Sequence, residues 1–233
     1  MTPPDARLPL LTASDFLARL GPAVLPSIEL MPEHHNHVPG LFNTEWVAAA
    51  SLPVADEKLP AQTVALVDGP EFQRSTALDM AAGAYQERPR TRVYESLDVR
   101  SDGWFSLASL HLAGMLRRGV VCTAYESRTG DRTLGAHYDH WLGVIVQMRG
   151  AKQWQIWPRA DGAPVELLMR PGDVLVLPQG MLHDVSTPEH PGNSLHLVFA
   201  VTDEHLPDRP KPEQASPRAH LPTERTPAVA QKH

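Results

Sequence analysis

Residues 170–185 read RPGDVLVLPQGMLHDV, and they carry the strongest signal for how this chain folds. A Pro-Gly-Asp turn at 171–173 leads into a short apolar strand, and a second turn follows at 178–180. The second turn is followed by His183, which would lie on a strand that runs back along the preceding strands. This succession of turn, strand and turn favours a small antiparallel barrel, in which the chain reverses direction every few residues.

The same succession of short apolar runs and turn residues extends over residues 120–202. Sequences such as Thr-Gly-Asp, Arg-Gly, Pro-Gly-Asp and His-Pro-Gly-Asn separate the runs. The runs are VVCTAYES, WLGVIVQM, KQWQIW, VELLM, DVLVLP, MLHDVS and SLHLVFAVT. About seven strands at this spacing predict a mainly β protein whose core is an antiparallel barrel or jelly roll.

The segments on either side of this barrel have a different character. Residues 1–119 predict a mixed, largely helical region that packs on the barrel, including one helix that Ser106 caps and Gly119 ends. Residues 203–233 are polar and rich in proline, and they predict a disordered tail whose function stays open. The chain length suits one hydrophobic core.

Composition narrows the classes of function. Hydrophobic residues make up 42% of the chain, and no apolar run approaches the roughly 18 residues that a membrane span needs. The N-terminus lacks the basic and apolar parts of a secretory signal, so we expect a cytoplasmic protein without membrane contact. The formal net charge is −6, and the tail holds as many acidic as basic residues, so the folded part is acidic. Direct binding of nucleic acid is therefore not expected.

His137 and Asp139, in the segment GAHYDHW, are two residues apart and point to the same face of a strand. His183 follows 44 residues after Asp139, on a strand that the barrel would return to this pair. Two imidazoles and one carboxylate form the facial triad that binds Fe(II) in non-haem oxygenases, and this triad leaves coordination positions open for a 2-oxo acid and O₂. A hydrogen-bonded pair of His137 and Asp139 without metal is the alternative explanation.

A longer motif strengthens the metal hypothesis. Gly172, Pro178, Gly180 and His183 reproduce the second cupin motif, G-x5-P-x-G-x2-H, position for position. The block of residues 120–202 resembles the JmjC-type 2-oxoglutarate oxygenases, most closely the cupin-like branch that contains the ribosomal oxygenases. The residues that carry the resemblance are Tyr125, His137, Tyr138, Asp139, Gln147, Gly150, Lys152, Trp154, residues 171–175, Pro178, Gly180, His183 and residues 194–197. The implied fold is a double-stranded β-helix, the jelly-roll barrel of the cupin and JmjC families.

The resemblance also implies roles beyond the three candidate metal ligands. Lys152 would pair with the distal carboxylate of 2-oxoglutarate, and an inward lysine in an apolar barrel needs an anion on physical grounds as well. A lysine on a solvated strand edge is the alternative. Further candidates are Thr123, Ser127 and His196 for cosubstrate binding, and Tyr125, His140 and Trp141 for substrate binding. His140 and Thr187 depart from the family, which commonly has an acidic residue and an asparagine there.

The expected reaction follows from the resemblance. Fe(II), 2-oxoglutarate and O₂ would be used to hydroxylate a C–H bond, with succinate and CO₂ as co-products. Asp139 favours hydroxylation over halogenation, because related halogenases leave this ligand position empty. Two alternatives stay open: a metal cupin enzyme, an isomerase or a dioxygenase, that does not use 2-oxoglutarate, and a non-catalytic barrel that binds a ligand. The first would not need Lys152, and the second would not need the complete triad.

These residues do not identify the substrate. The resemblance suggests an amino-acid side chain in a peptide or protein, whereas the acidic folded part is equally compatible with an amino-acid-derived small molecule. A homodimer is compatible with the resemblance as well. A second histidine cluster, made of His34, His35 and His37, lies in a Pro/Gly-flanked loop without a spaced partner motif. An exposed or substrate-lining loop is therefore favoured over a second metal site.

Overall fold

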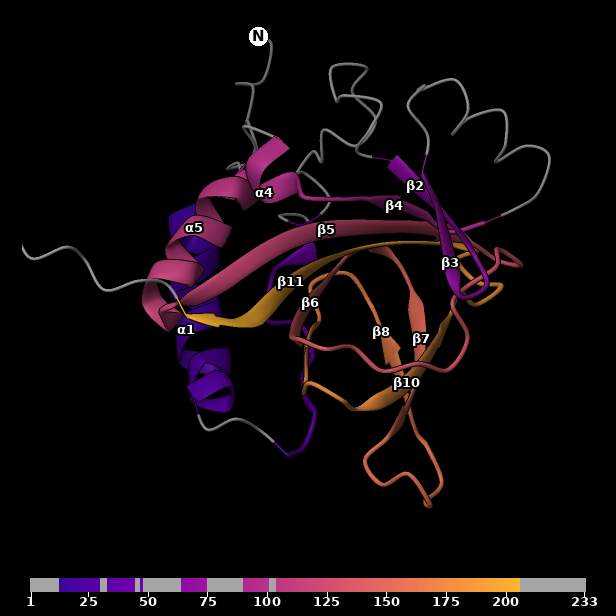
Figure 1. Cartoon of the computed structure of the whole chain (residues 1–233). Helices are drawn as coiled ribbons and strands as arrows, with labels where there is room; N and C mark the ends of the chain where they lie inside the picture. The colour runs from indigo at the N-terminus through magenta and orange to yellow at the C-terminus, as the bar shows by residue number, and fades with distance from the viewer. Residues whose placement is uncertain are drawn as a thin grey trace, which may run out of the picture.

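The structure is a computed structural model that describes residues 13–29, 33–44, 47, 64–74, 90–100 and 104–205. These residues form an eight-stranded and a three-stranded sheet, and helices cover one face of the larger sheet (Figure 1). The helices of the described part are α1 (Ala13–Glu29), α4 (Leu97–Arg100) and α5 (Trp104–Leu116). The strands are β1 (Asn36–Val38), β2 (Val64–Asp68), β3 (Glu71–Arg74), β4 (Arg92–Tyr94), β5 (Arg118–Arg128), β6 (Leu142–Gly150), β7 (Lys152–Trp157), β8 (Val165–Met169), β9 (Val174–Leu177), β10 (Leu182–Ser186) and β11 (Asn193–His205).

The two sheets make the jelly-roll barrel. The larger sheet has the order β1-β9-β6-β11-β5-β4-β2-β3, and the smaller has the order β10-β7-β8. All pairs of these strands are antiparallel. Each of the seven runs predicted from the sequence forms one strand, from β5 to β11. The predicted mainly β class with a jelly-roll barrel is confirmed.

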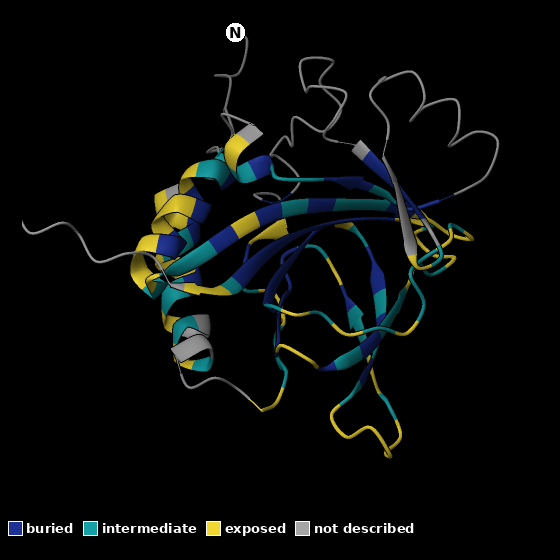
Figure 2. Cartoon of the chain, viewed as in Figure 1, coloured by how far each residue is buried: buried dark blue, intermediate teal, exposed yellow. Residues whose placement is uncertain are grey.

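Alternate residues of the central strands β6 and β11 point to opposite faces of the larger sheet and pack in two separate hydrophobic clusters. Val144 and Phe199 pack against the helices, in a cluster that includes Phe16 of α1. Ile145 and Val198 point to the other side and pack with the smaller sheet. Because side chains alternate with a period of two, one sheet separates a helix-covered core from the barrel interior. Figure 2 shows the buried strands between the partly exposed helices and the smaller sheet.

The region before residue 120, expected to be mixed and largely helical, contributes the short strands β1 to β4 as well as the helices in its described part. β4 pairs with β5, β2 pairs with β4, and β1 pairs with β9 at the opposite side of the sheet. The sheet extends past the expected boundary at residue 119 because β5 and β9 would otherwise present unpaired backbone groups at its edges. At the other end, β11 runs to His205, and the rest of the expected tail lies outside the described residues.

Helix α5 begins and ends differently from the prediction. Ser106 lies inside the helix and is not its cap, and its hydroxyl donates to the carbonyl of Leu97 at 3.0 Å. Arg117 follows the last helical residue, and its φ of 56° is the left-handed conformation expected near a helix end. Gly119 instead lies within β5. No helix in the described part of the chain has both the length and the apolar character needed to cross a membrane.

Candidate functional site

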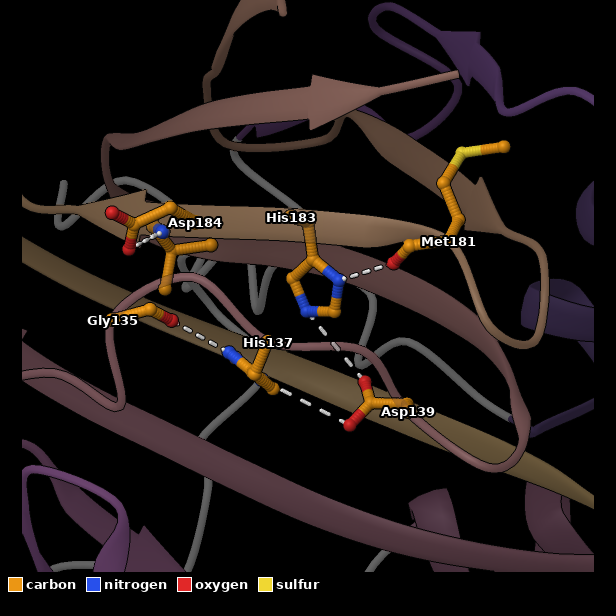
Figure 3. Close-up of polar contacts among 7 residues, drawn as sticks. Gly135, His137, Asp139, Met181, His183 and Asp184 are labelled. Carbon is orange, nitrogen blue, oxygen red and sulfur yellow. Dashed lines mark hydrogen bonds and ion pairs between the residues drawn. The ribbon is translucent and has the colours of Figure 1, made fainter. Parts of the chain in front are cut away.

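His137 and His183 are brought together by the backbone. The N–H of each donates to the carbonyl of the other at 2.9 Å, and the centroids of their rings are 4.3 Å apart. Asp139 is held in the same way, since its carbonyl accepts from the N–H of Gly180 at 2.9 Å. These bonds fasten the segment before β6 to the turn and strand that carry His183, and the three side chains converge (Figure 3).

The geometry of the three side chains fits a metal ion. One ligand atom from each of His137, Asp139 and His183 lies within 4.8 Å of the others. Nε2 of His137 is 3.9 Å from Oδ1 of Asp139, and Nε2 of His183 is 3.7 Å from Oδ2. These distances are too long for hydrogen bonds but suit donors that surround one ion at about 2.0–2.2 Å. Within the described ranges, no other group of His, Cys, Asp or Glu has such an arrangement.

Backbone carbonyls orient both imidazoles. Nδ1 of His137 lies 2.8 Å from the carbonyl of Gly135, and Nδ1 of His183 lies 2.9 Å from that of Met181. Because a carbonyl only accepts, Nδ1 carries the proton and the Nε2 lone pair is free to bind a metal. Burial lowers the pKa of His183 to about 4, so this ring is neutral, as a metal ligand must be. Burial raises the pKa of Asp139, and a bound cation would favour its carboxylate form.

The triad lines a cavity of about 250 Å³ between the two sheets. Strands of both sheets contribute its walls, which are mainly aromatic and aliphatic. The polar residues of the lining are Thr91, Tyr125, Thr133, His137, Asp139, Lys152, His183 and His196. A second cavity of about 480 Å³ is larger but contains none of the candidate site residues. The smaller cavity is therefore the candidate functional site, because chemistry depends on the groups present and not on volume.

Lys152 lies in this cavity and is only 1% exposed. Its ammonium donates to the hydroxyls of Ser127 at 2.9 Å and of Thr187 at 3.2 Å, and these hydroxyls are 2.6 Å apart. Burial lowers the pKa of Lys152 to about 8, although the charges of Asp131 and Asp184 act in the opposite direction. Within the described residues, the hydrogen-bond partners of this buried cation are thus neutral. An anionic ligand would complete its environment.

Three other residues proposed from the sequence also lie at the cavity. His196 and Tyr125 line it with stacked rings, whose centroids are 5.1 Å apart and whose planes differ by 5°. Trp141 lines it as well. Burial and the nearby charge of Lys152 lower the pKa of His196 well below its usual value, so this ring is neutral. In the cavity, the ammonium of Lys152 therefore lies beside the neutral rings of His196, Tyr125 and Trp141.

Thr123 and His140 do not line the cavity. Thr123 is on the same face of β5 as Tyr125, but it lies about 7 Å further along the strand. His140 directly follows Asp139, so its side chain turns away from the site and is exposed. Its ring meets the ring of Tyr138 edge-on, with centroids 5.7 Å apart. Both residues lie beside the site: the charge of His140 acts to lower the pKa of Asp139 against the larger effect of burial, and Thr123 is opposite the lining residue Val198 in the strand pairing.

Several residues in or beside the cavity were not proposed as site residues from the sequence. Thr187 holds Lys152, and the available signal was its position four residues after His183, where the family commonly has asparagine. Val67 and Thr91 line the cavity from the region before the barrel. No local pattern marks these two, because they reach the cavity only through the pairing of β2 and β4 with the larger sheet.

The histidine cluster at residues 34–37 does not form a second metal site in the structure. It includes part of β1, and Nε2 of His37 lies 3.4 Å from Oδ2 of Asp173. The carboxylate of Asp173 also accepts from the backbone N–H groups of Gly40 and Arg170, both at 2.8 Å. The cluster is therefore part of the attachment of β1 to the Pro-Gly-Asp turn, and it does not line the cavity.

Part of the chain matches the model of a known protein family. Residues 109–164 match the model of the JmjC domain family, and this segment contains His137, Asp139 and Lys152 but ends before His183. Ribosomal oxygenase 2 of Rattus norvegicus is 31% identical over 97 residues, which cover 35% of this chain and 21% of that protein. The bifunctional lysine-specific demethylase and histidyl-hydroxylase NO66 of Aedes aegypti is 29% identical over 97 residues, which cover 33% of this chain and 15% of that protein. The alignments thus span about a fifth or less of these relatives.

Solved structures show the same fold. YcfD, a ribosomal oxygenase from Escherichia coli, superposes with a TM-score of 0.57 at 14% identity, covering 87% of this chain and 62% of that one. The structure of YcfD in complex with cobalt and 2-oxoglutarate superposes with a TM-score of 0.53, covering 88% of this chain and 63% of that one. The shared fold and the JmjC match together confirm the resemblance to JmjC-type oxygenases.

Proposed function

We propose that this chain is an Fe(II)- and 2-oxoglutarate-dependent oxygenase. The observation that carries the proposal is that His137, Asp139 and His183 share one buried cavity with Lys152. Two imidazoles and a carboxylate suit Fe(II) and leave positions for other ligands. The buried ammonium suits the distal carboxylate of a 2-oxo dicarboxylic acid. The structure of YcfD with cobalt and 2-oxoglutarate has the same fold and supports this assignment.

The residues of this chain would bind and orient the reactants. Lys152 would pair with the distal carboxylate, while Ser127 and Thr187 hold its ammonium in place through their hydroxyls. His196 and Tyr125 form a neutral wall beside the cosubstrate. The remaining lining is mostly aromatic and aliphatic, which suits the apolar part of a bound cosubstrate or substrate.

The chemistry itself would come from the bound groups. The iron centre, with 2-oxoglutarate and O₂, would supply the power to oxidise a C–H bond of the substrate to C–OH, with 2-oxoglutarate converted to succinate and CO₂. One oxygen atom goes to the product and one to succinate, so the reaction balances. Because Asp139 provides the third protein donor, hydroxylation is proposed in preference to halogenation.

The proposed substrate is an amino-acid side chain in a peptide or protein. The matched relatives support this class, since their names describe a ribosomal oxygenase and a histidyl-hydroxylase. An amino-acid-derived small molecule has the same reacting groups and is also compatible with the cavity. We therefore propose hydroxylation of an amino-acid side chain. A screen for succinate release with peptides and with free amino acids distinguishes a protein substrate from a small molecule.

An anaerobic titration tests the proposal. Fe(II) is added to the apo-protein, 2-oxoglutarate follows, and the weak visible charge-transfer band of the chelate is recorded. We expect a saturable band for the wild type, no band for Asp139→Ala, and weaker binding of 2-oxoglutarate for Lys152→Ala. Arg159→Ala removes an exposed cation and should behave as the wild type does. Metal binding without a band in the wild type would instead favour a metal cupin that does not use 2-oxoglutarate.

A further inference from the structure

Trp154 lines the cavity with a buried N–H group that lacks an acceptor. The side chain is 4% exposed, and its Nε1 has no hydrogen-bond partner among the described residues. An indole N–H can only donate, and a buried donor without an acceptor is costly. In the part of the chain that the structure describes, Trp104 also has an unpaired indole N–H, but Trp154 lines the cavity, where a bound molecule can supply the acceptor that buried donors nearly always have.

The strand register places Trp154 between the metal site and Lys152. On β7, Lys152, Trp154 and Ile156 are buried and alternate with half-exposed residues, so they share the inward face. On the neighbouring β10, His183 is opposite Ile156, and Val185 is opposite Trp154. The inward face therefore carries the metal-site histidine, then Trp154 and then the lysine, in this order.

Ring contacts place Trp154 close to both groups of the site. Its ring centroid is 5.7 Å from that of His183 and 6.1 Å from that of His196, which comes from the larger sheet. His196 is itself near Lys152, whose charge lowers its pKa. A dicarboxylate anchored at one end by Lys152 and at the other by the metal has to pass along Trp154.

We propose that Trp154 is a positioning residue for the cosubstrate, whose indole N–H donates a hydrogen bond to a carboxylate oxygen of the bound 2-oxo acid. This inference rests on the proposed function. A hydrogen bond to a charged acceptor is stronger than a neutral one, and its loss corresponds to roughly a ten- to hundred-fold change in affinity. The bond would hold the molecule in one orientation between the lysine and the metal.

A nuclear magnetic resonance titration of the wild type tests the bond directly. The ¹⁵N-labelled protein is loaded with Zn(II), 2-oxoglutarate is added, and the indole N–H signals are followed, with Trp154→Phe and Trp157→Phe used to assign two of them. We expect the Trp154 signal to move downfield and the Trp157 signal to stay, because Trp157 is on the opposite face of β7. Binding of 2-oxoglutarate that leaves the Trp154 signal in place overturns the inference. If no signal responds and no binding occurs, the proposed function fails with it.

Affinity measurements give an independent test. Trp154→Phe keeps an aromatic ring but removes the N–H, and Trp157→Phe is the matched change on the other face of the same strand. In Co(II)-loaded protein, we expect Trp154→Phe to bind 2-oxoglutarate roughly ten- to hundred-fold more weakly, with its affinity for Co(II) unchanged. Trp157→Phe should bind both as the wild type does. Wild-type affinity for 2-oxoglutarate in Trp154→Phe overturns the inference. If this variant does not fold, the Trp154 signal is assigned by elimination from Phe variants of the other four tryptophans, and the titration of the wild type decides.

Discussion

His137 and His183 exchange both of their backbone hydrogen bonds, so the two imidazoles of the candidate metal site are cross-strand neighbours. In an antiparallel pair of this kind the Cα atoms are about 5.5 Å apart, and the two side chains leave the same face. The spacing of the two imidazoles is therefore set by the backbone and does not depend on flexible side chains. Metal binding should need little rearrangement.

Asp139→Asn should greatly weaken metal binding. The substitution keeps the size of the side chain but removes the negative charge that a divalent cation prefers. Loss of residues that only support metal ligands already costs about ten- to hundred-fold in affinity, so loss of a ligand should cost at least as much. Titration with Co(II), followed by absorbance, measures the effect. Asp161→Asn, at an exposed site, is the control, and equal Co(II) affinity in both variants would show that Asp139 is not a ligand.

The affinity for 2-oxoglutarate should fall as the pH rises from 7 to 9. Burial lowers the pKa of Lys152 to about 8, so the ammonium loses its proton over this range and no longer attracts the carboxylate. The decline begins near the pKa of about 8 that the lysine has without ligand, and it levels off at the higher pKa that the bound carboxylate gives the lysine in the complex. Calorimetric titration of Zn(II)-loaded protein at constant ionic strength measures the trend. In Lys152→Met the affinity should be low at every pH, and a decline of wild-type size in this variant would assign the titration to another group.

Without ligand, Lys152→Met should be more stable than the wild type at pH 7. The lysine has a pKa of about 8 in the folded chain and 10.5 as its ordinary value, so the folded state bears the cost of a buried charge below pH 8. Between pH 8 and 10.5 the unfolded chain binds more protons than the folded chain, so this group makes the wild type more stable as the pH rises. The free energy of unfolding in urea should show the variant's advantage at pH 7 and its decrease toward pH 10. A variant that is less stable than the wild type at pH 7 would contradict this account.

Gly172→Ala should strongly destabilise the barrel. Gly172 has a φ of 93°, and a Cβ there would collide with the carbonyl oxygen of Phe42, a backbone atom that cannot easily move. The left-handed conformation costs an alanine about 1–2 kcal/mol, and the collision adds about 1–3 kcal/mol or more. Gly130→Ala is the matched control, because its φ is 81° but a Cβ there would meet nothing within 4 Å. Urea unfolding should show the larger loss for Gly172→Ala, and equal losses would exclude the collision.

Residue types and short spacings were sufficient to predict that His137, Asp139 and His183 come together, whereas the expected reaction came from the family resemblance. The two-residue step from His137 to Asp139 orients both side chains to one face, and the turns before His183 reverse the chain toward them. The seven strands followed from local runs of apolar residues in the same way. These features depend on the period of a strand and on turn geometry, which act over a few residues.

Long-range strand pairing accounts for what the sequence did not reveal. Thr187 reaches Lys152 through the register of β10 on β7, and Thr91 reaches the cavity because β4 pairs with β5. The same pairing adds the short strands β1, β2 and β4 of the mixed, largely helical region to the larger sheet. Such register is chosen by hydrogen bonds and packing between segments far apart in the chain, so no local pattern encodes it. The identity of the candidate metal ligands is therefore a local property of this sequence, whereas the shape and lining of the cavity are properties of the assembled barrel.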